Sequence, residues 1–203
     1  RATISMKFGV SSTSDCIAIA AGSNINLTIK NLTVSAPKQG VSGLTFPDHI
    51  GGVCRLILEG TNQFTSNQED TPAVRKRTRG QLIISGKGKL IASAGAACGI
   101  GSPAGCKNLY IEGGTIHAEV VNAQKLAIGH GAVYGNSSST VHYMGGTIEG
   151  IYKGNGMFCA GLTGENANVI ITGGSIHSVN KINLSKPMNI SRHTHPTNGS
   201  DKV

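Results

Sequence analysis

The stretch NLYIEGGTIHA at residues 108–118 decides the fold, because near-copies of it return later in the chain. The clearest copies are TVHYMGGTIEG at 140–150 and NVIITGGSIHS at 168–178, and weaker ones precede them: LTIKNLTV at 27–34, LILEGTNQF at 56–64 and LIISGKGKL at 82–90. Alignment on one turn residue per copy gives spacings of 29, 26, 27, 32 and 28 residues; these turn residues are Asn31, Gly60, Gly86, Gly113, Gly145 and Gly173. A period in this range is typical of a solenoid.

Each copy divides into short strands joined by glycine turns. In residues 108–118 the apolar positions Leu109, Ile111, Ile116 and Ala118 alternate with polar ones, so they are expected to face the core. A third short strand recurs as VSGL at 41–44, TPAV at 71–74, ACGIG at 97–101, LAIG at 126–129 and FCAG at 158–161, and no amphipathic helix is visible. The sequence therefore predicts an all-β fold, a right-handed parallel β-helix (β-solenoid) with three short strands per coil and about 28 residues per coil.

The repeats also set the domain limits. Residues 1–182 are expected to form one β-solenoid domain, in which residues 1–22 form the first coil or a cap. After residue 179 the periodicity fades, and residues 183–203 contain turn formers without a pattern, which predicts an exit segment or linker.

Composition restricts the partners. The net charge of the 203-residue chain is +8, but it reflects few acids, 10 Asp and Glu in all, rather than many bases. The one dense basic cluster, RKRTR at 75–79, has no interleaved aromatic residues for base stacking, so we predict no nucleic-acid partner. No apolar run is long enough to span a bilayer, and we predict no membrane insertion.

The chain has five cysteines and no CxxC pair. The closest two, Cys98 and Cys106, are eight residues apart, so the spacing predicts no zinc site. Most lie beside apolar residues, which favours buried free thiols over the alternative of one disulfide.

Several of the repeat motifs carry a resemblance to a known family. INLTIKNLTV at 25–34, LEGTN at 58–62, LIISGKGKLIAS at 82–93, ACGIG at 97–101 and the GG[TS]I copies resemble the β-helix repeat modules of large secreted or surface-anchored proteins of Gram-positive gut bacteria and related anaerobes. Such modules are often labelled carbohydrate-binding. The resemblance spans roughly residues 15–180. It implies a secreted or cell-surface module that recognises a ligand or serves as a scaffold without catalysis, joined to further domains of a larger parent protein.

Two enzymatic alternatives depend on carboxylates. The repeat alignment predicts Glu59 and Glu112 in one outward column with Ser85 between them, about 10 Å apart, at the outer edge for an inverting glycoside hydrolase. A calcium-dependent polysaccharide lyase would use Glu69 and Asp70 near Arg75; the sequence otherwise predicts no cofactor, and calcium is the one alternative. A phage tail-spike-like adhesin is a third alternative with the same architecture.

A further column is predicted for His117, Glu149 and His177 on adjacent coils. Three ligands in a line on a flat face do not converge on an ion, so this column is expected to be a hydrogen-bonded ladder and no metal site is predicted.

The predicted ligand is an acidic polysaccharide, bound by the insertion at residues 66–79 and by exposed rings. Arginine forks match carboxylate and sulfate groups, and a solenoid face repeats at about 4.8 Å. The candidate residues are Arg75, Lys76, Arg77, Arg79, Tyr110, His117, His142 and His177. The alternative is that these basic residues only keep a loop soluble.

Overall fold

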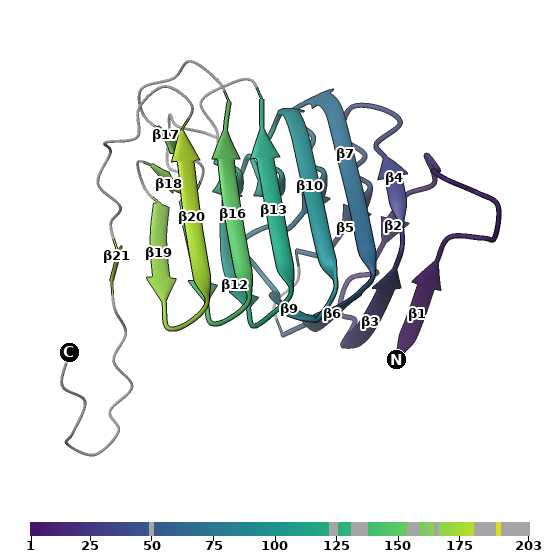
Figure 1. Ribbon diagram of the computed structural model, residues 1–203, viewed down its shortest axis with the longest axis horizontal. Coiled ribbons are helices and arrows are strands. Elements are labelled where there is room, and N and C mark those ends of the chain that lie inside the picture. Colours follow the sequence, from purple (N-terminus) through teal and green to yellow (C-terminus); the bar gives the residue numbers. More distant parts are fainter. Residues whose placement is uncertain are drawn as a thin grey trace.

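The fold is a β-solenoid of about five turns with roughly 28 residues per coil, as predicted. The computed structural model describes residues 1–48, 51–121, 126–130, 138–153, 159–160, 162–164, 167–180 and 190–191. Over these ranges every regular element is a strand, and no helix is present. Figure 1 shows the strands standing side by side along the long axis of the molecule.

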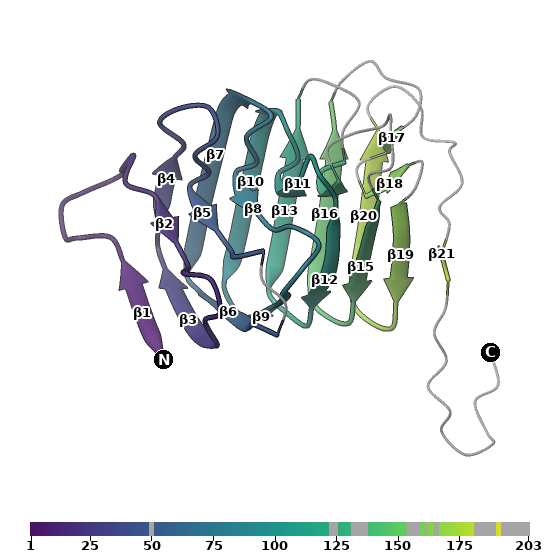
Figure 2. The same cartoon turned by 180° about the vertical axis from the view of Figure 1, so that it is seen from behind.

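Three sheets run along the solenoid, and each full coil adds one strand to each. Sheet A contains, in spatial order, β1 (Ala2–Ser5), β3 (Ile25–Lys30), β6 (Val53–Glu59), β9 (Gln81–Gly86), β12 (Cys106–Ile111), β15 (Ser139–Tyr143), β19 (Ala167–Ile171) and β21 (Ile190–Ser191). Sheet B contains β4 (Thr33–Ser35), β7 (Thr61–Glu69), β10 (Lys89–Ala96), β13 (Thr115–Val120), β16 (Thr147–Tyr152) and β20 (Ser175–Asn180). Sheet C contains β2 (Ile17–Ala18), β5 (Leu44–Thr45), β8 (Val74–Arg75), β11 (Ile100–Ser102) and β14 (Ile128–His130). Figure 2 shows the solenoid from behind, with the strands of sheets A and C.

Within the three sheets all strand pairs are parallel, and the register continues from coil to coil except for shifts between Ala94 and Ala96 against β7 and between Cys106 and Leu109 against β15. In sheet A, Leu56 pairs with Ile84 and Ile84 pairs with Ile111, so like residues stack in columns inside the solenoid. A separate antiparallel pair joins β17 (Cys159–Ala160) to β18 (Thr163–Gly164). The parallel three-sided coil follows from the repeat, because each copy supplies the same alternation at the same place.

The core is the column of apolar side chains between the three sheets. Leu109, Ile111, Ile116 and Ala118 are all fully buried, which confirms the predicted inward positions. Each buried Leu or Ile stabilises the fold by about 1.5–3 kcal/mol relative to an exposed one. Tyr143 occupies an inward position stacked on Ile111, and burial raises the pKa of its hydroxyl.

The first coil is formed by residues before Ile25. β1 pairs with β3, β2 pairs with β5, and Thr13 bridges to Val34, so this coil contacts all three sheets. The predicted exit segment at 183–203 lies outside the described residues except for β21, which pairs with β19.

The four described cysteines are free thiols. Cys54, Cys98 and Cys106 are buried, and Cys16 is half-buried. The side chain of Cys159 lies outside the described residues. Burial raises the pKa of the Cys106 thiol to about 11.

The corner between sheets A and B differs in length between coils. From Leu56 to Thr61 the chain takes five residues to pass from one sheet to the next, and from Ile84 to Lys89 it also takes five. The equivalent pairs of the next two coils, Ile111 to Thr115 and Tyr143 to Thr147, take four. Two neighbouring coils therefore have one extra residue at this corner, and both sheets stay in register around it.

Candidate functional site

Two aromatic rings stack on the outer face of sheet A. Tyr110 on β12 pairs in register with His142 on β15, and their ring centroids lie 4.5 Å apart with an interplanar angle of 18°. Both side chains are partly exposed. Because the rings stack face to face, each covers one face of the other, and the pair carries a hydroxyl and ring nitrogens that can hydrogen-bond to sugar hydroxyls.

An ion pair flanks these rings. Arg55 Nη1 lies 2.6 Å from Glu112 Oε2, and because β9 lies between their strands, the pair crosses β9. Ile83 on β9 stands between Arg55 and Tyr110 in the outward column and is only 7% exposed. The outer face of sheet A is thus an ordered surface of apolar, aromatic and charged groups.

The basic loop after β8 is joined to the edge of sheet A. Asn108 Nδ2 donates to the carbonyl oxygen of Thr78 at 3.1 Å, which ties this loop to the start of β12. Arg77 and Arg79 are exposed. Asp48 accepts a hydrogen bond from the Arg79 backbone N–H at 2.7 Å and lies 3.8 Å from the Arg77 guanidinium, so one carboxylate partly offsets two arginines.

The expectation of one exposed insertion at residues 66–79 is wrong. β7 continues to Glu69, and β8 at Val74–Arg75 belongs to sheet C. Arg75 is half-buried, and desolvation lowers the pKa of its guanidinium. The strand alternation of the repeat continues through this segment and turns part of it inward.

Lys76 is the clearest correction, since its side chain is 1% exposed and cannot belong to an outward basic patch. Its Nζ donates to the carbonyl oxygens of Arg79 at 3.0 Å and Lys107 at 2.8 Å, and to that of Arg77. Desolvation lowers the pKa of this amine. Lys76 therefore ties the loop at residues 77–79 to strand β12 from inside the solenoid.

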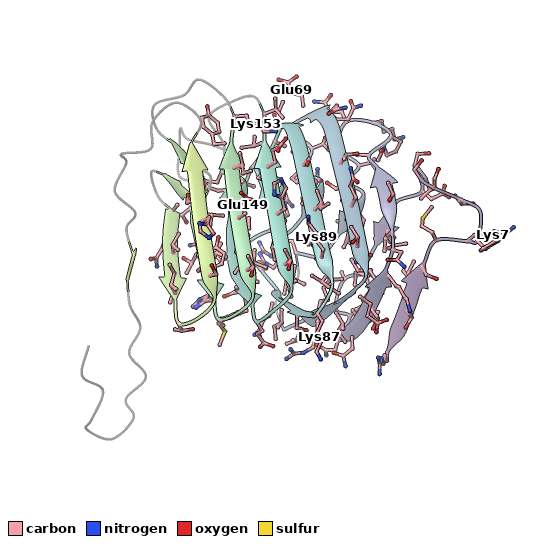
Figure 3. The ribbon with its side chains drawn as sticks, viewed as in Figure 1. Lys7, Glu69, Lys87, Lys89, Glu149 and Lys153 are labelled. Carbon is pink, nitrogen blue, oxygen red and sulfur yellow. The ribbon has the colours of Figure 1, made fainter. Side chains whose placement is uncertain are left out.

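The predicted column on sheet B is present. His117 pairs with Glu149, and Glu149 pairs with His177 on adjacent strands. His117 Nδ1 lies 2.7 Å from Glu149 Oε2, and its Nε2 lies 3.7 Å from Glu119, which also binds Lys153 at 2.7 Å. Figure 3 shows Glu149 and Lys153 on this face. Among the described residues, no group of three or more His, Cys, Asp or Glu side chains could hold a metal ion.

The predicted shared column of Glu59 and Glu112 is wrong. Ser85 pairs with Ile57 and not with Glu59, which pairs with Lys30 instead. The error comes from the choice of turn glycine: the alignment takes Gly86 as the equivalent of Gly60, whereas the equivalent glycine is Gly88, because Thr61 pairs with Lys89.

The structure brings some candidate residues together and separates others. Tyr110 and His142 are in contact on sheet A, with the exposed arginines Arg77 and Arg79 at its edge. His117 and His177 lie on sheet B, so they cannot contact the part of a ligand that Tyr110 and His142 contact on sheet A.

Sequence reasoning missed the Arg55–Glu112 pair and the lysines Lys30, Lys87 and Lys89 at the A/B corner. A signal for the lysines was available, because the turn GKGK at 86–89 places charges where later copies have a plain GGT or GGS.

Comparison of this chain with protein-family models, with curated proteins and with solved structures finds no match. Within the described part of the chain, no helix has the length and apolar character that a membrane span requires.

Proposed function

We propose that the protein is a non-catalytic recognition module that binds acidic polysaccharide on the outer face of sheet A, outside the cell or at its surface. The observation that carries this proposal is the stacked Tyr110–His142 pair, which holds a hydroxyl and ring nitrogens in fixed positions on the outer face of a parallel sheet. Because both rings are held by strand backbone rather than by a loop, little ordering is needed when a ligand binds.

The preference for an acidic ligand comes from charge. The chain carries +8, and Arg77 and Arg79 are exposed at the edge of this surface, where Asp48 lies near the Arg77 guanidinium and accepts from the Arg79 backbone. Arginine binds carboxylate and sulfate in a bidentate manner, whereas a neutral glycan would gain nothing from these groups.

The test is affinity electrophoresis in gels that contain polygalacturonate, alginate or chondroitin sulfate at low salt. We expect retardation of the unaltered protein, and a loss of about tenfold in affinity for the double variant Y110A/H142A, since each ring contact contributes roughly 0.5–1.5 kcal/mol. Incubation with the same polymers should yield no unsaturated products and no new reducing ends; their appearance would support the lyase or hydrolase alternative.

The matched control is H117A/H177A, which removes two rings from sheet B. Its binding should equal that of the unaltered protein. If both double variants lost affinity equally, or if about 0.15 M salt abolished all retention, the attraction would be nonspecific charge and the proposal would be wrong.

A further inference from the structure

A second surface feature lies at the A/B corner, where residues of four successive coils line an open groove of about 690 Å³. This volume is within the range of small-ligand sites. Its lining consists of corner residues and strand ends: Lys30, Ile57, Leu58, Glu59, Gly60, Thr61, Gly86, Lys87, Gly88, Lys89 and Thr115.

The groove coincides with the two coils that have an extra corner residue. Both of these corners, around Gly60 and around Gly86 to Gly88, line it. Side chains are excluded from part of its floor: a Cβ on Gly88 would meet the Glu59 nitrogen and the Gly60 oxygen at 2.7 Å. The close contact between coils therefore requires glycine at the buried position 88, whereas Gly60 in the same groove lining is exposed.

Three lysines and one carboxylate surround this floor. Lys30 Nζ lies 3.8 Å from Glu59, and both side chains are about half exposed, so this ion pair is weak. Within the described residues, no carboxylate lies within ion-pair distance of Lys87 or Lys89. Figure 3 shows Lys87 at the edge where the chain turns and Lys89 on the face of β10, so the two amines flank the corner from different sides.

We infer that this groove binds an anionic group of a sugar, a uronate carboxylate or a sulfate ester, between Lys87 and Lys89. This inference rests on the proposed function and adds a subsite to it. The threonine hydroxyls of Thr61 and Thr115 can donate to or accept from neighbouring sugar hydroxyls.

The position of the groove suits the same polymer. Along β6 the outward residues are Arg55, Ile57 and Glu59, so the surface runs from beside the Tyr110–His142 rings into the groove. At about 3.3 Å per residue, the four residues from Arg55 to Glu59 span roughly 13 Å, and Arg55 itself lies two strand spacings, roughly 10 Å, from Tyr110 across β9. An oligosaccharide of a few units is long enough to reach both places.

The experiment is NMR titration of the full chain with a tetragalacturonate, with a sulfated tetrasaccharide, and with a short oligothymidylate. We expect the amide resonances of Gly60, Gly86 and Gly88 to shift with one or both sugars. The sugar that binds with the higher affinity identifies the anionic group as carboxylate or sulfate. A stronger effect of the oligothymidylate would overturn the assignment to a sugar.

The variant K87Q/K89Q should weaken binding of the better sugar about tenfold at low salt, since it removes two charge contacts. The control K7Q/K38Q removes the same charge from two exposed lysines outside the groove lining and should bind like the unaltered protein. Equal losses in both variants, or no shift of the three glycine amides, would overturn the inference.

The two proposals fail in different ways. If the unaltered protein binds no acidic sugar at all, the proposed function itself is wrong. If Y110A/H142A weakens binding but K87Q/K89Q does not, recognition on sheet A stands and only the groove is excluded.

Discussion

At the scale of single residues, a buried amine is the least expected feature of the chain. Lys76 satisfies the carbonyl oxygens of Arg77, Arg79 and Lys107 from inside the solenoid. A buried acceptor left without a donor costs about 1–3 kcal/mol. Lys76, which the sequence predicts to be one of several surface charges, is therefore part of the core.

We predict that Lys76→Met lowers the free energy of unfolding by about 3 kcal/mol, because the methionine fills the space without replacing the hydrogen bonds. The measurement is urea denaturation followed by circular dichroism. The control Lys87→Met, at an exposed site, should change stability by less than about 0.5 kcal/mol. Equal stabilities of the two variants would contradict the burial of Lys76.

A second residue-scale prediction concerns alkaline pH. Burial raises the pKa of Cys106 to about 11 from an ordinary value of 9.0. A raised pKa means that the folded state keeps the thiol proton at a pH where the unfolded state has lost it. The thiol's contribution to the free energy of unfolding is therefore complete below pH 9 and is lost as pH rises through 11. Between pH 8 and 11 the unaltered protein should lose about 2 kcal/mol more stability than Cys106→Ala. Parallel stability curves for the two proteins would show that the thiol titrates normally.

At the scale of strands, the alternation of faces can be tested within one repeat. Ile116 on β13 is fully buried, whereas Glu112 lies outward with its carboxylate beside Arg55. We predict that Ile116→Asp costs several kcal/mol, because it places an unpaired charge in the core, while Glu112→Ala costs less than about 1 kcal/mol. Melting temperatures measured by calorimetry should rank the two variants in this order. Equal values would mean that the assigned faces are wrong.

The strands and their faces were predictable because copies of one pattern occur six times. The contact of Tyr110 with His142 also follows from the copies, since both rings occupy the third position of their stretch. The position of Lys76 did not follow, because its acceptors lie in the irregular loop at residues 77–79 and on Lys107 of the next coil, which no local pattern relates. The equivalence of Glu59 with Glu112 failed for a different reason: Gly60 and Gly86 are not equivalent turn residues, and Ser85 pairs with Ile57, two residues before Glu59, a shift that keeps the same face outward and leaves no mark in the alternation.

At the scale of the whole molecule, stability should vary along the axis. In the first coil Ile4, Ile17 and Ile19 are only partly buried, whereas the central residues Leu82 and Ile84 are fully buried. Each coil of a solenoid contacts only its neighbours, so an end coil loses the support of one side.

We therefore predict that backbone amides of β1 and β2 exchange with deuterium faster than those of β9 and β10. Hydrogen exchange followed by mass spectrometry at neutral pH measures this difference directly. Uniform protection along the chain would indicate that the solenoid opens only as one cooperative unit.

The longer corner has a consequence for changes in chain length. An insertion within a strand would turn every following side chain to the opposite face. At the A/B corner, however, two coils accommodate an additional residue while Ile84 still pairs with Ile111 and Lys89 still pairs with Thr115. The number of residues at this corner can thus vary without changing how the side chains of the core pack. It is the natural place to graft a foreign peptide, and a library of one- and two-residue insertions there would diversify the surface while leaving the scaffold intact.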